Sequence, residues 1–332
     1  VQDENGQKMS KSKGNAVDPM EALKKFGADP LRWYFYTNSA PWLPSRFHEK
    51  AVIEGQKKFF STLWNTYYFF VLYANIGEGF DASKYRLEDC SLTVMDKWLL
   101  SRLNTAVKAV DENLSAYKVP EAARVLQDFV DEMSNWYVRR SRERFWAEAE
   151  SDDRTAAFMT LYTALVTTAK MTAPMAPFIS EEIYRNLVCS VDKTAPESVH
   201  LCQYPAYEES RVDKKLEADM DEVLRVVTLG RAARNLANIK NRQPLCCLYT
   251  DADQGLGELY QDLNVKELEF LTDMSQFTDY TFKPQLKLLG KKLGKRLGET
   301  RTVLQELDGA AAKKELDTTG VLKLTLSDGE IE

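Results

Sequence analysis

The chain has 332 residues, of which 44% are hydrophobic and 28% are charged, and its formal net charge is −6 at pH 7. This length allows roughly two or three domains, each with its own hydrophobic core. No run of about 18 or more apolar residues occurs, which excludes a predicted membrane-spanning helix. The net negative charge argues against a protein that binds nucleic acid nonspecifically over its whole surface. It is compatible with a folded site that has local basic faces.

Five cysteines occur, an odd number without CxxC spacing: Cys90, Cys189, Cys202, Cys246 and Cys247. This pattern disfavours structural zinc and a disulfide framework, and it fits free thiols in a reducing compartment. We therefore expect a cytoplasmic protein with no metal site in this segment and no membrane partner.

A lysine- and serine-rich run covers residues 7–15, with the sequence QKMSKSKGN. Lysine carries a compact charge on a flexible stem, which suits contact with a phosphate whose charge shifts during a reaction. A helix start follows this run: Asp18 is the predicted N-cap, Pro19 the first helical residue and Glu21 an acid in the first turn. The pattern predicts a mobile phosphate-binding loop ahead of a helix, and a solvated linker is the alternative interpretation.

Helical periodicity dominates the next part of the chain. Residues 16–48 predict two short helices, the second capped by Asp29 before Pro30. A long helix is predicted over 49–76, with an apolar stripe between Phe59 and Phe70 that we interpret as core. Further helices are predicted over 94–116, 120–148, 153–173 and 177–188. Short connections between long amphipathic helices predict an antiparallel bundle.

After residue 205 the pattern changes to a mixture of helix and strand. A helix is predicted over 211–240 and a strand over 243–249, and 265–270 fits either a strand or a helix. Residues 280–283 and 320–326 are further strand candidates. These elements predict a small α/β or α+β module, either whole or truncated at its end.

Two basic segments are candidate RNA-contacting surfaces. The first lies in the predicted helix through residues 135–146, where arginine can pair with phosphate and aromatic rings can stack on unpaired bases. Its candidate residues are Trp136, Arg139, Arg140, Arg142 and Arg144. In the alternative, Trp136, Phe145 and Trp146 are core, and the arginines pair with Asp128, Asp131, Glu132 and Glu143.

The second basic segment, residues 283–301, places Lys287, Lys291 and Lys295 at i, i+4 and i+8. This spacing predicts an amphipathic helix with a basic face, and a merely solvated face is the alternative. Three glycines, Gly290, Gly294 and Gly298, oppose the helix, since each costs about 1 kcal/mol relative to alanine.

The string KMSKSKGN, followed by Asp18-Pro19, resembles the signature loop of class I aminoacyl-tRNA synthetases. The resemblance implies that the loop clamps the triphosphate of ATP, bound with Mg²⁺, while the carboxylate of an amino acid attacks the α-phosphate. It implies catalytic roles for Lys8 and Lys11. The implied ATP-binding residues are Lys8, Met9, Ser10, Lys11 and Ser12.

In that family a nucleotide-binding sheet and a histidine motif precede the loop. Here eight residues precede Met9, and neither His48 nor His200 lies in such a motif. We therefore expect this chain to be the C-terminal part of a longer enzyme. Its partners would be the N-terminal catalytic and editing domains of that enzyme, and the chain alone would not activate an amino acid.

Of three further strings, FGADPLRWY resembles the continuation of the signature loop in that family, and WYVRRSRERFW and KNRQPL resemble isoleucyl-tRNA synthetases. The resemblance covers essentially the whole chain. The third resembles a eukaryotic-like branch of these enzymes, which some bacteria also carry. The resemblance implies loop and linker over 1–48, an anticodon-binding helical bundle over 49–205 and a C-terminal module over 206–332. It implies tRNA(Ile), and no DNA, as the nucleic-acid partner.

Alternatives remain at this stage. A valyl, leucyl or methionyl enzyme of the same class would share the bundle. A noncatalytic tRNA-binding helical scaffold could retain the loop without its chemistry. The basic segments could also be solvated faces that bind no RNA by themselves.

Overall fold

The computed structural model describes residues 1–39, 42–76, 79–146, 151–252, 259–260, 264–271 and 293–331. The chain divides into two compact units, Val1–Glu217 and Ala218–Glu332. Within the described residues, no helix has both the length and the apolar character needed to cross a membrane. The predicted boundaries at 48 and 205 remain predictions.

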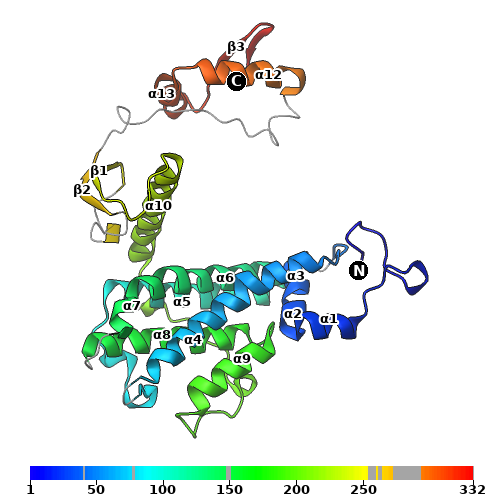
Figure 1. The fold of residues 1–332 in the computed structure, drawn as a ribbon, viewed down its shortest axis with the longest axis vertical. Coiled ribbons are helices and arrows are strands. Elements are labelled where there is room, and N and C mark those ends of the chain that lie inside the picture. Colours follow the sequence, from blue (N-terminus) through cyan, green and yellow to red (C-terminus); the bar gives the residue numbers. More distant parts are fainter. Residues whose placement is uncertain are drawn as a thin grey trace. The chain divides into compact units, whose positions relative to one another are not determined.

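The first unit begins with the loop and two short helices, α1 (Pro19–Phe26) and α2 (Ala28–Thr37) (Figure 1). As predicted, the Asp18 carboxylate caps α1 by accepting the backbone N–H of Met20 at 2.7 Å. Gly27 joins the helices with φ +82°, a conformation that a side chain would strain. These elements share a small core formed by Ala22, Phe26, Leu31, Tyr34, Phe47 and Val52.

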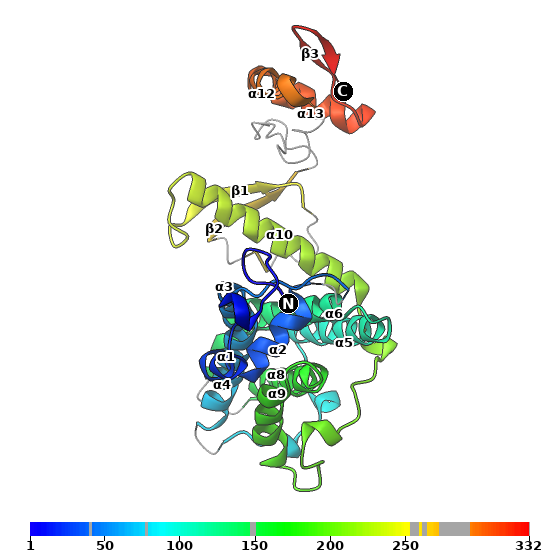
Figure 2. The same cartoon turned by 90° about the vertical axis from the view of Figure 1, so that its right-hand side faces the viewer.

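The remainder of this unit is the predicted helical bundle. Helix α5 packs against α6 and α8, and α8 packs against α9, as Figure 1 and Figure 2 show. A π-helical turn joins α3 to α4, and another joins α6 to α7. The bundle helices are α3 (Glu49–Gly55), α4 (Thr62–Ala74), α5 (Val94–Ser115), α6 (Val119–Glu132), α7 (Arg139–Trp146), α8 (Asp152–Thr172) and α9 (Pro177–Tyr184).

Aromatic side chains fill the bundle core. Phe59 is fully buried and stacks on Trp33 with ring centroids 3.9 Å apart. Phe145 and Phe70 each meet Phe158 edge to face, at 4.9 and 5.6 Å. Such pairs stabilise a core beyond the area that they bury. The stripe between Phe59 and Phe70 is therefore core, as predicted, with the exception of Trp64, whose residue surface is 40% exposed.

The second unit contains most of α10 (Lys214–Leu236) and two small sheets. Strands β1 (Leu245–Thr250) and β2 (Val265–Phe270) are parallel, so 265–270 is a strand and not a helix. Helices α12 (Leu297–Glu306) and α13 (Gly309–Thr319) precede the antiparallel hairpin of β3 (Leu324–Leu326) and β4 (Gly329–Ile331). The strand candidate at 280–283 lies outside the described residues. A helical bundle with a small α/β module is the predicted fold class.

Candidate functional site

The lysine- and serine-rich loop is attached at its base to a neighbouring segment. The backbone N–H of Gln2 donates to the Ser45 carbonyl at 2.8 Å, and Phe47 N–H donates to the Gln2 carbonyl at 2.8 Å. Met9 is half-buried and packs on the small core under α1 and α2. Met9, which the family resemblance placed among the ATP-binding residues, therefore anchors the loop to this core.

The polar side chains of the loop face outward or bond to one another. Lys8 and Lys13 are exposed and form no ion pair with a described carboxylate. Ser10 Oγ and Ser12 Oγ lie 3.2 Å apart and share a hydrogen bond. Residues 11–13 form a single 3-10 turn, and the side chain of Lys11 lies outside the described part. The loop can thus offer at least two ammonium groups to an anion.

Asp29 does not cap α2, which corrects the sequence prediction. Gly27 precedes α2 at Ala28, so Asp29 lies within the first turn and is buried. Its carboxylate instead accepts the backbone N–H groups of Phe178 and Ile179 at 3.3 and 2.7 Å. These belong to the first turn of α9, where Ala176 provides no capping side chain. Burial raises the pKa of Asp29, although both N–H groups oppose that shift.

Arg32, one turn later in α2, completes this attachment. Its Nε donates to the Met175 carbonyl at 3.1 Å, and Nη2 donates to the Pro174 carbonyl at 3.0 Å. Asp29 and Arg32 therefore satisfy the N–H groups that begin α9 and the carbonyls between α8 and α9. We call these two residues the α2 clamp. No local pattern pointed to it, because its partners lie more than 140 residues away.

Arg144 does not belong to an RNA-contacting surface, contrary to the sequence prediction. Only 15% of its side chain is exposed, and it makes a bidentate ion pair with the fully buried Asp96 at 2.8 Å for both nitrogens. Its Nε donates to Asp153 Oδ1 at 2.9 Å, and the remaining N–H groups reach Thr93 and the Asp153 carbonyl. Every N–H of the guanidinium thus has an acceptor, which leaves none for phosphate. The acids predicted in the alternative, Asp128, Asp131, Glu132 and Glu143, are not among the ion-pair partners of Arg144.

The other four residues predicted to contact RNA here lie at the surface or near it. Arg139 and Arg142 are exposed, and Arg142 lies 6.0 Å from the ring centroid of Phe69. Arg140 lies over the ring of the half-buried Trp136 at 5.5 Å, a cation–π contact. Phe145 is core, with 1% exposed, and Trp146 is exposed. The surface that could meet RNA here, which we call the Trp136 surface, comprises Trp136, Arg139, Arg140 and Arg142.

The second basic segment is described only in part. Lys287 and Lys291 lie outside the described residues, as does the side chain of Lys295. Residues 294–296 form a 3-10 turn that leads into α12, with Gly294 at φ +50°. A continuous α-helix through Gly294 is therefore wrong, since the left-handed conformation interrupts it.

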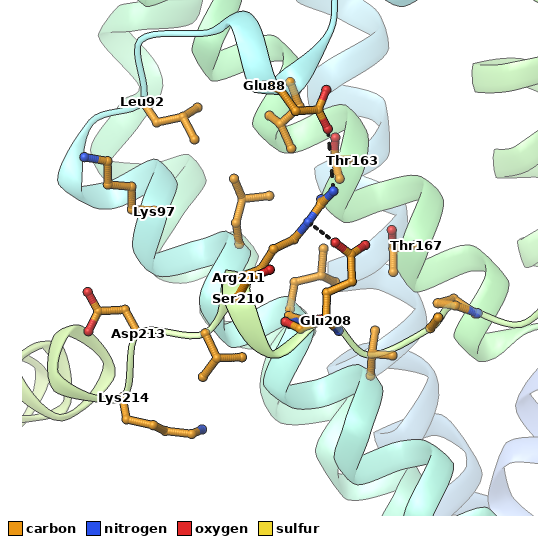
Figure 3. Close-up of a pocket in the computed structure, with 18 of the residues that line it drawn as sticks. Glu88, Leu92, Lys97, Thr163, Thr167, Glu208, Ser210, Arg211, Asp213 and Lys214 are labelled. Atoms are coloured by element: carbon orange, nitrogen blue, oxygen red, sulfur yellow. Dashed lines mark hydrogen bonds and ion pairs between the residues drawn. The ribbon is translucent and has the colours of Figure 1, made fainter.

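A cavity of about 740 Å³ lies between α5, α8 and residues 205–214. Figure 3 shows Arg211 between two carboxylates, with Nε 2.8 Å from Glu208 and Nη2 3.5 Å from Glu88. Asn104 of α5 bonds to both the N–H and the carbonyl of Glu208, which ties the segment down. The central cation is thus neutralised, and none of the described residues predicted for either site lines this cavity.

One group of potential metal ligands lies on the β1–β2 pair. The ligand atoms of Cys247, Glu267 and Glu269 lie within 4.8 Å of one another. Both carboxylates are exposed, and burial together with neighbouring carboxylates raises the pKa of the thiol. Exposed acidic groups commonly bind no ion, so we assign no metal site here.

Two segments of the chain match known protein families. Residues 1–43 match the family described as tRNA synthetases class I (I, L, M and V), and residues 96–249 match the anticodon-binding domain of tRNA ligase. The loop and the bundle are therefore similar to class I tRNA ligases. The loop lies in the first match, and the Trp136 surface lies in the second.

Within that class, curated relatives are named isoleucine–tRNA ligase. Those of Clostridium novyi, Clostridium tetani and Thermus thermophilus are 51%, 45% and 44% identical over 93%, 100% and 94% of this chain. The chain spans only 30 to 32% of the length of these relatives. The resemblance to isoleucyl-tRNA synthetases is confirmed. A eukaryotic-like branch is not supported, because these relatives are bacterial.

Proposed function

We propose that this chain is the part of an isoleucine–tRNA ligase that carries the ATP-contacting loop and a surface for the anticodon arm of tRNA(Ile). One observation carries the proposal. The 45% identity to the isoleucine–tRNA ligase of Clostridium tetani runs through 100% of the chain, and so through the loop and the bundle alike. The whole protein would activate isoleucine with ATP and transfer it to tRNA in the cytoplasm.

In this function the loop binds the phosphates of ATP. ATP with Mg²⁺ supplies the phosphate on which isoleucine is activated. The exposed ammonium of Lys8, together with Lys11, neutralises charge on the phosphates as pyrophosphate leaves. The Asp3 carboxylate already accepts three hydrogen bonds within the loop, so we expect the ligands of Mg²⁺ to lie elsewhere in the ligase. The missing catalytic and editing domains would select the amino acid.

The Trp136 surface would hold RNA through charge and stacking. Arg139 and Arg142 are exposed and can pair with backbone phosphates. Arg140 over Trp136 offers a flat cationic and aromatic face, which suits an unpaired base. Lys287, Lys291 and Lys295 would add backbone contacts from the second unit.

Binding of the purified chain to isoleucine, valine, leucine and methionine tRNA transcripts across a salt series tests the RNA part. We expect preference for the isoleucine transcript that persists as salt rises, on top of a salt-dependent phosphate contribution. Equal affinity for all four transcripts would refute recognition of tRNA(Ile) by this chain.

ATP–pyrophosphate exchange tests the loop part. The chain alone should show no isoleucine-dependent exchange, and a complete ligase carrying these residues should lose exchange in Lys8→Ala and Lys11→Ala. Exchange by the chain alone would contradict its assignment as one part of the enzyme.

A further inference from the structure

Asn15 closes the loop by bonding to three separate places in it. Its Oδ1 accepts the backbone N–H of Ser10 at 3.0 Å. Its Nδ2 donates to Asp3 Oδ2 at 2.8 Å and, more weakly, to the Lys8 carbonyl at 3.4 Å. One amide side chain thus connects the start, the middle and the end of the loop.

Asp3 organises the segment on the other side of this contact. Its Oδ1 accepts the N–H groups of Asn5 and Gln7 at 3.0 and 2.8 Å, and its own N–H donates to the Gln7 carbonyl at 2.8 Å. The hydrogen bond from Asn15 and that from Gln7 lower the pKa of this carboxyl, and the charge of Lys13 acts in the same direction. Asp3 is therefore an anion at neutral pH with all its hydrogen bonds made inside the loop.

We infer that Asp3 and Asn15 are a positioning pair that holds the loop ordered before ATP binds. The inference rests on the proposed function for its ATP part. A free loop must lose conformational freedom when it engages phosphates, and that loss weakens binding. The pair fixes the backbone between residues 3 and 15 in advance and leaves the ammoniums of Lys8 and Lys13 in solvent. Neither residue needs to touch the phosphates itself.

The geometry supplies a specific test, because the two side chains can exchange roles. In Asn15→Asp two carboxylates face each other and repel. In Asp3→Asn two amides meet, and Asn15 cannot serve both Ser10 and residue 3 as it does now. In the double variant, Asn at position 3 keeps one oxygen for Asn5 and Gln7 and donates to the new carboxylate at position 15. That carboxylate still accepts the Ser10 N–H and loses only the weak contact with the Lys8 carbonyl, and the net charge equals that of the wild type.

Limited trypsin digestion of this chain measures the order of the loop without any need for ATP. Cleavage after Lys8, Lys11 and Lys13 is compared with cleavage after Arg242, in an exposed turn of the second unit. Each single variant should speed loop cleavage about three- to tenfold, as expected for loss of one or two hydrogen bonds. The double variant should return to within about twofold of the wild type. Unchanged cleavage in the single variants, or effects that simply add in the double variant, would overturn the pair.

Exchange kinetics in a complete ligase with these residues test the positioning role. Each single variant should raise KM for ATP about three- to tenfold with a smaller change in kcat, and the double variant should restore KM. Rescue of cleavage without any effect on KM would overturn the role in ATP binding. Absence of isoleucine-dependent exchange in the unaltered ligase would instead refute the proposed function, and the digestion result would stand apart from it.

Discussion

Arg144 and Asp96 form a bidentate ion pair across the bundle, although 48 residues separate them in the chain. Asp96 is fully buried in the first turn of α5, and it also accepts the Tyr137 hydroxyl at 2.6 Å. Thr93 and Asp96 form a reciprocal cap at the start of α5, so the same carboxylate caps α5 and binds Arg144 of α7. The pair joins α5 to α7, and Asp153 extends it to α8.

Removal of the arginine should destabilise the first unit strongly. Arg144→Ala leaves the Asp96 charge buried without its partner, which typically costs about 3–5 kcal/mol. Urea denaturation measures the free energy of unfolding, and Arg139→Ala on the same helix is the matched control. The control should change stability by no more than about 0.5 kcal/mol. Equal effects of the two variants would show that the buried ion pair contributes little.

Stability should fall in acid because of the same carboxyl. Burial by itself raises the pKa of Asp96, but the hydrogen bonds from Arg144 and Tyr137 and the charge of Arg144 outweigh it, so the pKa lies below its ordinary value of 3.8. The ionised carboxylate therefore contributes its full stabilisation when the pH is above the ordinary pKa of 3.8. This contribution is lost as the pH falls through the lowered pKa of the folded state. Burial also raises the pKa of Glu217, but hydrogen bonds from Ser101, Thr105 and Lys214 outweigh it, so this pKa is lowered too. Glu217 therefore adds to the loss of stability in acid.

Urea titrations at several pH values check this linkage. Asp96→Asn, which cannot ionise, should start less stable and lose less stability than the wild type between about pH 5 and pH 3. Parallel acid profiles for the two proteins would contradict the assignment of the acid loss to Asp96.

The α2 clamp should control the order of the first turn of α9. Asp29→Ala leaves the N–H groups of Phe178 and Ile179 without an acceptor, and loss of a cap costs about 0.5–2 kcal/mol. Asp29→Asn should cost less, because one amide oxygen can still accept and no charge is buried. Hydrogen exchange of the Phe178 and Ile179 amides should accelerate more in the alanine variant than in the asparagine variant. Unchanged exchange in both would show that other groups cap α9.

The exposed arginines of the Trp136 surface should contribute to RNA affinity through charge. Arg139→Ala and Arg142→Ala should each reduce the slope of log affinity against log salt by about one unit, with little change in preference among tRNA species. Arg86→Ala, which removes an exposed arginine from another segment, is the matched control. A control effect as large as those of Arg139 and Arg142 would mean that RNA binding does not depend on this surface.

Local pattern was sufficient for most of the helices. The periodicity that predicted a helix over 94–116 corresponds to Val94–Ser115, and the Asp18 cap lies where the local rule placed it. Tertiary contacts decided the exceptions. Asp29 fits the same local rule and yet caps a helix 149 residues away, because Ala176, the residue before α9, has no side chain that can cap it.

The site was predictable to a similar extent. The loop and the basic helix could be found from residue types and spacing, since their chemistry is local. Which arginines of the helix are structural and which are exposed could not be predicted from local pattern. Arg144 is structural because it pairs with Asp96, 48 residues earlier in the chain, whereas Arg139 is exposed. The Asp3–Asn15 pair was also missed, as it depends on how the loop folds back on itself.

Exchange of anticodons between transcripts tests the central claim most directly. The valine tRNA transcript is given the isoleucine anticodon, the isoleucine transcript is given the valine anticodon, and binding of both to the chain is measured at one salt concentration. We predict that preference follows the anticodon, so that the altered valine transcript binds nearly as tightly as tRNA(Ile). Preference that stays with the body of the tRNA, or no preference at all, would contradict a surface for the anticodon arm of tRNA(Ile) on this chain.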